Sequence, residues 1–117
     1  MSQILRIKAK MKDLAVVKKV AKAKGLKITK KGEQGFYSGT TNGVGIHLPN
    51  WRYPLVVGEN GEVSYDNYGG RWGNVKELNS FVRDYTAEKI KTEARKKGYS
   101  CTQKKNNNEI KLTIYVD

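Results

Sequence analysis

The sequence is poor in the residues that carry most enzyme chemistry and all disulfide cross-links. Its 117 residues include one cysteine, Cys101, and one histidine, His47. A single cysteine excludes an internal disulfide and favours a cytoplasmic location. The paired Cys or His spacings of zinc sites are absent. We therefore expect no bound metal and no cofactor.

Long apolar runs are missing too. No stretch approaches the roughly 20 apolar residues of a membrane span, and the first six residues lack the apolar core of a secretory signal. We therefore expect no membrane partner. Apolar residues still make up 38% of the chain, which argues against wholesale disorder. The length fits one domain over residues 1–117.

Catalysis has little support in the sequence. His47 and Cys101 fall on different predicted strands, so a nucleophile–base pair would need the fold to bring them together. Glu59 and Glu62 flank a tight turn, where solvent reaches both. Asp66 is the only acid in an aromatic setting and is a weak site candidate. We expect a non-enzymatic protein without catalytic residues.

Positive charge is abundant and unevenly distributed. The net charge is +12; residues 1–32 carry 11 basic residues against one acid, residues 33–70 have a net charge of −3, and residues 71–117 have +5. Such asymmetry is typical of proteins with a polyanionic or acidic partner. Only five of the 23 basic residues are arginine, so a composition that serves solubility alone remains the alternative.

Residues 4–12 are predicted to form a strand, because apolar residues alternate with cations there. One face would carry Leu5, Ile7, Ala9 and Met11. The other would be a ladder of like charges about 7 Å apart, formed by Arg6, Lys8, Lys10 and Lys12. Repulsion along such a ladder would be relieved by phosphates.

A helix is expected over 14–24, with Asp13 as its N-cap and Gly25 after its end. Its exposed positions would add Lys18, Lys19, Lys22 and Lys24 to the basic surface. A second strand would begin at Leu26 and Ile28 and enter Lys30 and Lys31. The residues that we predict to contact nucleic acid or an acidic protein are Arg6, Lys8, Lys10, Lys12, Lys18, Lys19, Lys22, Lys30 and Lys31.

The middle of the chain is predicted to be rich in strands and turns. Residues 44–48 and 55–57 read as strands, and Asn60-Gly61 predicts a hairpin turn that leads into a partner strand over 63–68. A long helix is then expected over 75–97, with Asn74 and Glu77 as a capping box. Two more strands, 99–103 and 110–116, would close the chain.

The long helix carries apolar residues on two nearly opposite faces, by the 3.6-residue period. Leu78, Phe81 and Tyr85 lie on one, and Ala87, Ile90 and Ala94 on the other. A kink near Thr86 would turn both sets toward one core, and we favour this interpretation. Otherwise the second set would meet another element or another subunit, which would make a homodimer.

This order of elements predicts an α+β fold. Two helices on one face of a mainly antiparallel sheet is the economical arrangement. It resembles a ferredoxin-like core with a β-hairpin insert. This analogy rests on the order of elements and says nothing about the chemistry of the protein.

Aromatic residues gather in the same middle region that carries the negative charge. Several alternate with arginine, a combination that can stack unpaired bases. The candidate aromatic contact residues are Trp51, Arg52, Tyr53, Tyr68, Arg71 and Trp72. The alternative is that these rings fill the core. Because the lysines lie elsewhere in the sequence, two separate surfaces are expected, one cationic and one aromatic.

Several short segments resemble a known family: residues 1–8, 36–39, 71–73 and 93–99, with Tyr85. The family is the small cyanobacterial, plastid and phage family called domain of unknown function 1257 (hypothetical plastid open reading frame 35-like). The resemblance implies one α+β domain and supplies no information about an activity. Some relatives are encoded beside AAA-type ATPases, which implies an accessory or adaptor role.

Two functions therefore follow from the sequence. The first is a basic binding module that contacts nucleic acid through its lysine-rich surface. The second is an adaptor or phage-type inhibitor that binds an acidic protein, such as a nucleic-acid-handling or AAA-type ATPase complex.

Overall fold

A five-stranded antiparallel sheet is the base of the molecule. The computed structural model describes residues 4–7, 10–106 and 109–116. The sheet has the strand order β1-β5-β4-β3-β2. Its strands are β1 (Leu5–Ile7), β2 (Gly32–Phe36), β3 (Gly39–Ile46), β4 (Leu55–Val57) and β5 (Val63–Tyr65). A separate two-stranded sheet consists of β6 (Ser100–Asn106) and β7 (Glu109–Tyr115).

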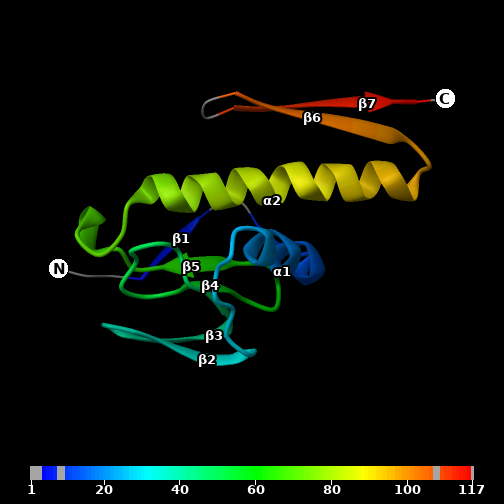
Figure 1. The fold of residues 1–117 in the computed structure, drawn as a ribbon. Coiled ribbons are helices and arrows are strands. Elements are labelled where there is room, and N and C mark those ends of the chain that lie inside the picture. The colour runs from blue at the N-terminus through cyan, green and yellow to red at the C-terminus, as the bar shows by residue number, and fades with distance from the viewer. Residues whose placement is uncertain (1–3, 8–9, 107–108, 117) are drawn as a thin grey trace.

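Two helices cover one face of the five-stranded sheet (Figure 1). Helix α1 (Leu14–Ala23) begins at Asp13, whose carboxylate accepts a hydrogen bond from the Val16 amide. Helix α2 (Val75–Lys96) begins at Asn74, whose side chain accepts one from the Lys76 amide. Both N-caps are those that the sequence predicts, and the short η1 helix (Tyr68–Gly70) precedes α2.

The main core lies between the two helices and the sheet. Strand β4 contributes Leu55 and Val57, which alternate toward this core, while Val56 between them is buried outside it. The helices contribute fully buried side chains such as Val17 and Phe81. Burial of an apolar side chain of this size stabilises the fold by about 1.5–3 kcal/mol, so this layer determines where the sheet and helices sit.

Helix α2 separates the main core from the β6–β7 hairpin, which packs against its opposite side (Figure 1). The predicted kink near Thr86 is wrong, since α2 runs unbroken from Val75 to Lys96. Instead, each apolar face has its own cover. Ala87 and Ala94 are buried, while Ile90 is 39% exposed. The second apolar face is thus covered in large part within the chain, and the homodimer, which was the alternative if that face met another subunit, stays a prediction.

The α+β class with an antiparallel sheet and two helices is confirmed. The ferredoxin-like detail is not, because in the described residues the strands after α2 pair only with each other. The hairpin predicted as an insert is instead the centre of the sheet, as β5 and β4 lie between β1 and β3. A fully apolar strand such as β4 is stable only with neighbours on both sides and cover on both faces.

The first strands also differ from expectation. The strand predicted over 4–12 is described only as Leu5–Ile7, and residues 10–12 lie outside any strand. At Met11 the amide donates to the carbonyl of Gly61 (2.8 Å), so the chain turns to cover the β4–β5 turn. Ile28 makes only an isolated bridge with Ile46, and β2 begins later, at Gly32.

The loop before α2 packs against the buried indole of Trp51 at Gly73. A Cβ atom at this position would overlap the indole ring, whereas one at Gly35 would meet nothing within 4 Å. We expect Gly73→Ala to lower the free energy of unfolding by about 1–3 kcal/mol, the usual cost of overpacking. Urea denaturation measures this, with Gly35→Ala as the control. Equal stability of both variants would contradict the packing described.

Candidate nucleic-acid interface

The predicted cation ladder does not form as a row on one strand. Only Arg6 lies in β1, and its Nε is 2.6 Å from the Glu62 carboxylate. Lys8 lies outside the described residues. Lys10 and Lys12 are exposed but follow the strand. The ladder is therefore wrong as a structural prediction, because β1 ends before its cations could alternate along one face.

The lysines of α1 and its C-cap, Lys24, divide into two groups by the direction they face. Lys19 and Lys24 face α2, where Lys19 contacts Glu88 (2.6 Å) and Lys24 contacts Asp84 (2.5 Å). Lys18 and Lys22 are exposed and make no ion pair with another described residue. They are one helical turn apart, a spacing of about 5–6 Å between Cβ atoms. This pair is the part of α1 that can meet an anion in solution.

Three further predicted cations keep their charge open to solvent. Lys10, Lys12 and Lys30 are exposed and form no ion pair within the described part of the chain. Lys31 pairs with Glu59 at 3.6 Å, and both side chains are well exposed. A pair of that kind contributes at most about 1 kcal/mol, so it does not hold Lys31 away from another anion. We call the set of open cations Lys10, Lys12, Lys18, Lys22 and Lys30 the open lysines.

Five of the six aromatic and arginine candidates do come together, and they gather around one indole ring. They belong to a cluster that we call the Trp72 cluster: Tyr37, Arg52, Tyr53, Tyr68, Arg71 and Trp72. Four separate segments supply it, namely the β2–β3 turn, the loop before β4, η1 and the loop before α2. The tertiary fold alone brings these segments together.

The rings and guanidinium groups of the cluster pack closely, with one stacked ring pair, one edge-on pair and one tilted pair that all include Trp72. Tyr68 is stacked on Trp72, with centroids 4.7 Å apart and planes at 28°. The guanidinium of Arg52 lies over the Trp72 ring at 4.9 Å, and that of Arg71 over the Tyr68 ring at 5.4 Å. Stacking of arginine on aromatic faces is favourable and holds a positive charge beside the rings.

Backbone hydrogen bonds hold the loops of the cluster in place. The Arg52 amide donates to the Trp72 carbonyl (2.8 Å), and the Trp72 amide donates to the Asn67 carbonyl (2.9 Å). The buried Asn67 side chain donates to the Gly73 carbonyl (3.3 Å). These bonds join three of the four segments, whereas Tyr37 of the β2–β3 turn contacts the cluster through its ring.

Trp51, the remaining aromatic candidate, belongs to the core. Its ring is only 8% exposed, and it packs against Tyr65 with centroids 5.9 Å apart. The indole Nε1 donates to the carbonyl of Asn74 (3.1 Å). The prediction of Trp51 as a contact residue is therefore not supported by its position, since its stacking faces are covered.

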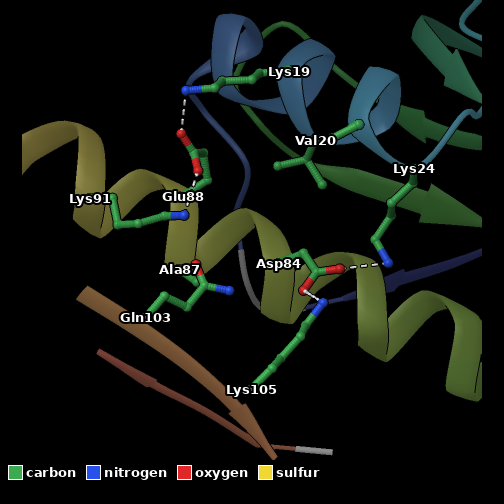
Figure 2. A pocket seen from close by; sticks show the side chains of 10 residues that line it. Lys19, Val20, Lys24, Asp84, Ala87, Glu88, Lys91, Gln103 and Lys105 are labelled. Carbon is green, nitrogen blue, oxygen red and sulfur yellow. Dashed lines mark ion pairs between the residues drawn. The ribbon is translucent and has the colours of Figure 1, made fainter. Parts of the chain in front are cut away.

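A hollow of about 250 Å³ lies between α1, α2 and β6, lined by charged side chains (Figure 2). Asp84 contacts Lys24 from α1 and Lys105 from β6, the latter at 3.3 Å. Glu88 contacts Lys19 and, at 3.1 Å, Lys91. Each carboxylate is thus shared by two ammonium groups, and through Asp84 the hairpin is joined to α1.

These carboxylates have lowered pKa values. Burial of Asp84 acts to raise its pKa, but the hydrogen bonds and charges of Lys24 and Lys105 outweigh this and hold it below its ordinary 3.8. Burial also acts to raise the pKa of Glu88, but the hydrogen bonds and charges of Lys19 and Lys91 outweigh it and hold this pKa below its ordinary 4.5. Both acids therefore stay ionised at neutral pH, and each attracts lysines from two different segments, although the four lysines of the hollow outnumber its two carboxylates. We interpret the hollow as a structural clamp.

The residues considered for catalysis stay apart. His47 follows β3, whereas Cys101 lies in β6 of the other sheet. Asp66 is 1% exposed, and its Oδ1 accepts a hydrogen bond from the Tyr68 amide (3.3 Å). In the described part of the chain, no three His, Cys, Asp or Glu side chains gather as a metal site would require.

Two features of these surfaces are not among the residues predicted from the sequence. Tyr37 is absent from the predicted contacts, although it is the cluster's most open ring. Asp84 and Glu88 are absent too, although their spacing of four residues places both on one side of a helix. The spacing of Asp84 and Glu88 could therefore have indicated from the sequence that they share one side of the helix. Their partners from α1 and β6 are not visible in the sequence.

Comparison with known proteins adds no assignment. The chain matches no protein-family model, no curated protein and no solved structure. The resemblance to domain of unknown function 1257 therefore stays a prediction. No helix in the described residues is long and apolar enough to cross a membrane.

The clamp makes stability depend on acid pH. Because the folded pKa values of Asp84 and Glu88 are lowered, their stabilisation is complete above about pH 5 and is lost as pH falls through the folded values. We expect Asp84→Asn to lower the free energy of unfolding by about 1–3 kcal/mol at pH 7, with a smaller difference at pH 3. Urea denaturation across this pH range measures both.

Glu33→Gln is the matched control for that experiment, since Glu33 is exposed and forms no ion pair with a described residue. It should follow the wild-type pH profile. If Asp84→Asn also follows that profile at every pH, the clamp does not stabilise the fold.

Proposed function

We propose that this protein is a non-enzymatic, cytoplasmic nucleic-acid-binding module whose open lysines contact the phosphate backbone. The observation that carries the proposal is the division of the α1 lysines. Lys19 and Lys24 are neutralised against α2, while Lys18 and Lys22 keep an open positive charge on the solvent side. In a chain of net charge +12, that charge has no internal counterion among the described residues.

Lysine is well suited to binding phosphate groups. An ammonium on a flexible stem is a point charge, poor at bidentate recognition but adequate for a phosphate oxygen. Contacts to phosphates position a protein on a nucleic acid without reading the base sequence. The expected binding is therefore salt-dependent and tolerant of base sequence, with each phosphate contact releasing a condensed counterion.

An acidic protein surface is the competing partner, and salt dependence alone does not distinguish it. The charge of a nucleic acid is regularly spaced and dense, so the logarithm of the binding constant falls linearly with the logarithm of salt concentration. Its slope gives the number of phosphates neutralised. A direct titration with nucleic acid therefore tests the proposal even when no protein partner has been identified.

Lys18→Glu with Lys22→Glu should weaken this binding strongly. Removal of two phosphate contacts should reduce the salt slope by roughly 1.4–1.8, from about 0.7–0.9 per contact, and the reversed charges should lower affinity further. Fluorescence anisotropy with labelled oligonucleotides at several salt concentrations measures both quantities.

The matched control changes the same charge on the hairpin. Lys104 and Lys111 are exposed and lie opposite each other across β6 and β7. Lys104→Glu with Lys111→Glu reverses two charges there and should weaken binding much less than the α1 variant. Equal losses would mean that net charge alone drives binding, and no binding by the wild type at low salt would exclude the proposed function.

A further inference from the structure

The Trp72 cluster has an open side that core packing does not require. Tyr37 is 69% exposed, the largest exposed fraction among the exposed large hydrophobic side chains. Its ring lies 5.6 Å from that of Trp72, which is itself only partly buried. An exposed aromatic ring beside a second one offers a stacking surface that water solvates poorly.

The backbone at the cluster is held in an unfavourable conformation. Tyr68 has φ 47°, in the left-handed region that bulky side chains rarely adopt. In this conformation the ring is stacked on Trp72, and the Tyr68 amide is held by the buried Asp66 carboxylate. Such strained residues concentrate at ligand-binding sites, and here the strain positions a ring.

Positive charge at the cluster is open as well. Arg52 and Arg71 are exposed, and neither forms an ion pair with another described residue. Each guanidinium lies over a ring of the cluster. A planar cation of this kind can stack under a base or bind a phosphate.

We propose that the Trp72 cluster stacks the unpaired bases of single-stranded nucleic acid, which gives the protein a preference for single strands over duplexes. This inference rests on the proposed function and adds a partner class to it. Bases in a duplex already stack on one another, so exposed rings can reach only unpaired bases. The positive charge of Arg52 and Arg71 beside the rings favours a polyanionic ligand over a protein surface with few acidic residues.

The test compares a short labelled oligothymidine with a duplex of equal length, at one salt concentration, by fluorescence anisotropy. The wild type should bind the single strand more tightly. Tyr37→Ala removes an exposed ring and should lower single-strand affinity by about 5- to 150-fold, the range measured for one stacked base, with duplex affinity unchanged. Arg52→Lys, which keeps the charge but loses the planar group, should also lower single-strand affinity selectively.

Tyr115→Ala is the matched control, because Tyr115 is 52% exposed on β7 and lies outside the cluster. It should bind both oligonucleotides as the wild type does. If Tyr37→Ala and Arg52→Lys leave single-strand affinity unchanged while the α1 charge reversals weaken it, the stacking inference is overturned and the proposed function stands. If the wild type binds neither oligonucleotide at low salt, both are overturned, and an acidic protein becomes the partner to seek.

Discussion

The rest of the structure depends on α2 having apolar side chains on two opposite sides. One side, with Leu78 and Phe81, closes the core over the sheet. The other, with Ala87 and Ala94, lies under the β6–β7 hairpin. An isolated hairpin is marginally stable in water, so the helix supplies the surface that keeps these strands folded. In return, the hairpin covers an apolar face that would otherwise be exposed.

Ion pairs complete this arrangement and determine which lysines remain available. Asp84 and Glu88 attract lysines from α1, α2 and β6 toward one hollow. Lys89 links α1 to α2 again, through Asp13 at 3.0 Å, and it also contacts Glu93 at 2.9 Å. Asp84, Glu88 and Glu93 of α2 are thus paired inside the molecule, and the lysines that face outward from α1 are left without them. The positive exterior is a consequence of how the fold distributes its few carboxylates.

The two candidate surfaces have different physical characters. The open lysines provide long, mobile point charges that bind without fixed geometry. By contrast, most of the Trp72 cluster has a fixed geometry, because hydrogen bonds hold the segments that carry Arg52, Tyr68 and Trp72 together. A long polyanion can use both, with phosphates contacting one surface and unpaired bases the other. A folded acidic protein would have less use for exposed stacking faces beside arginine.

Much of the local structure could be predicted because it depends on neighbouring residues. The caps at Asp13 and Asn74, the Asn60-Gly61 turn and the two-sided pattern of α2 are all short-range signals. The class of fold followed from them. The strand predicted over 4–12 was wrong at residues 10–12, because an alternating pattern does not show where the chain leaves the sheet. At Met11 the chain instead contacts the β4–β5 turn, where the Met11 amide donates to the Gly61 carbonyl.

The candidate sites needed distances that no short-range pattern contains. By itself, the sequence determined the excess of positive charge, the scarcity of catalytic residues and the two helices with their N-caps, since each depends on composition or on residues within a few positions. Only the tertiary structure decided which lysines are neutralised, that Trp51 is buried while Trp72 is not, and that Tyr37 joins rings from three other segments. Ion pairing and ring stacking act over a few ångströms in space between residues far apart in the chain, so they exist only once the layers have packed.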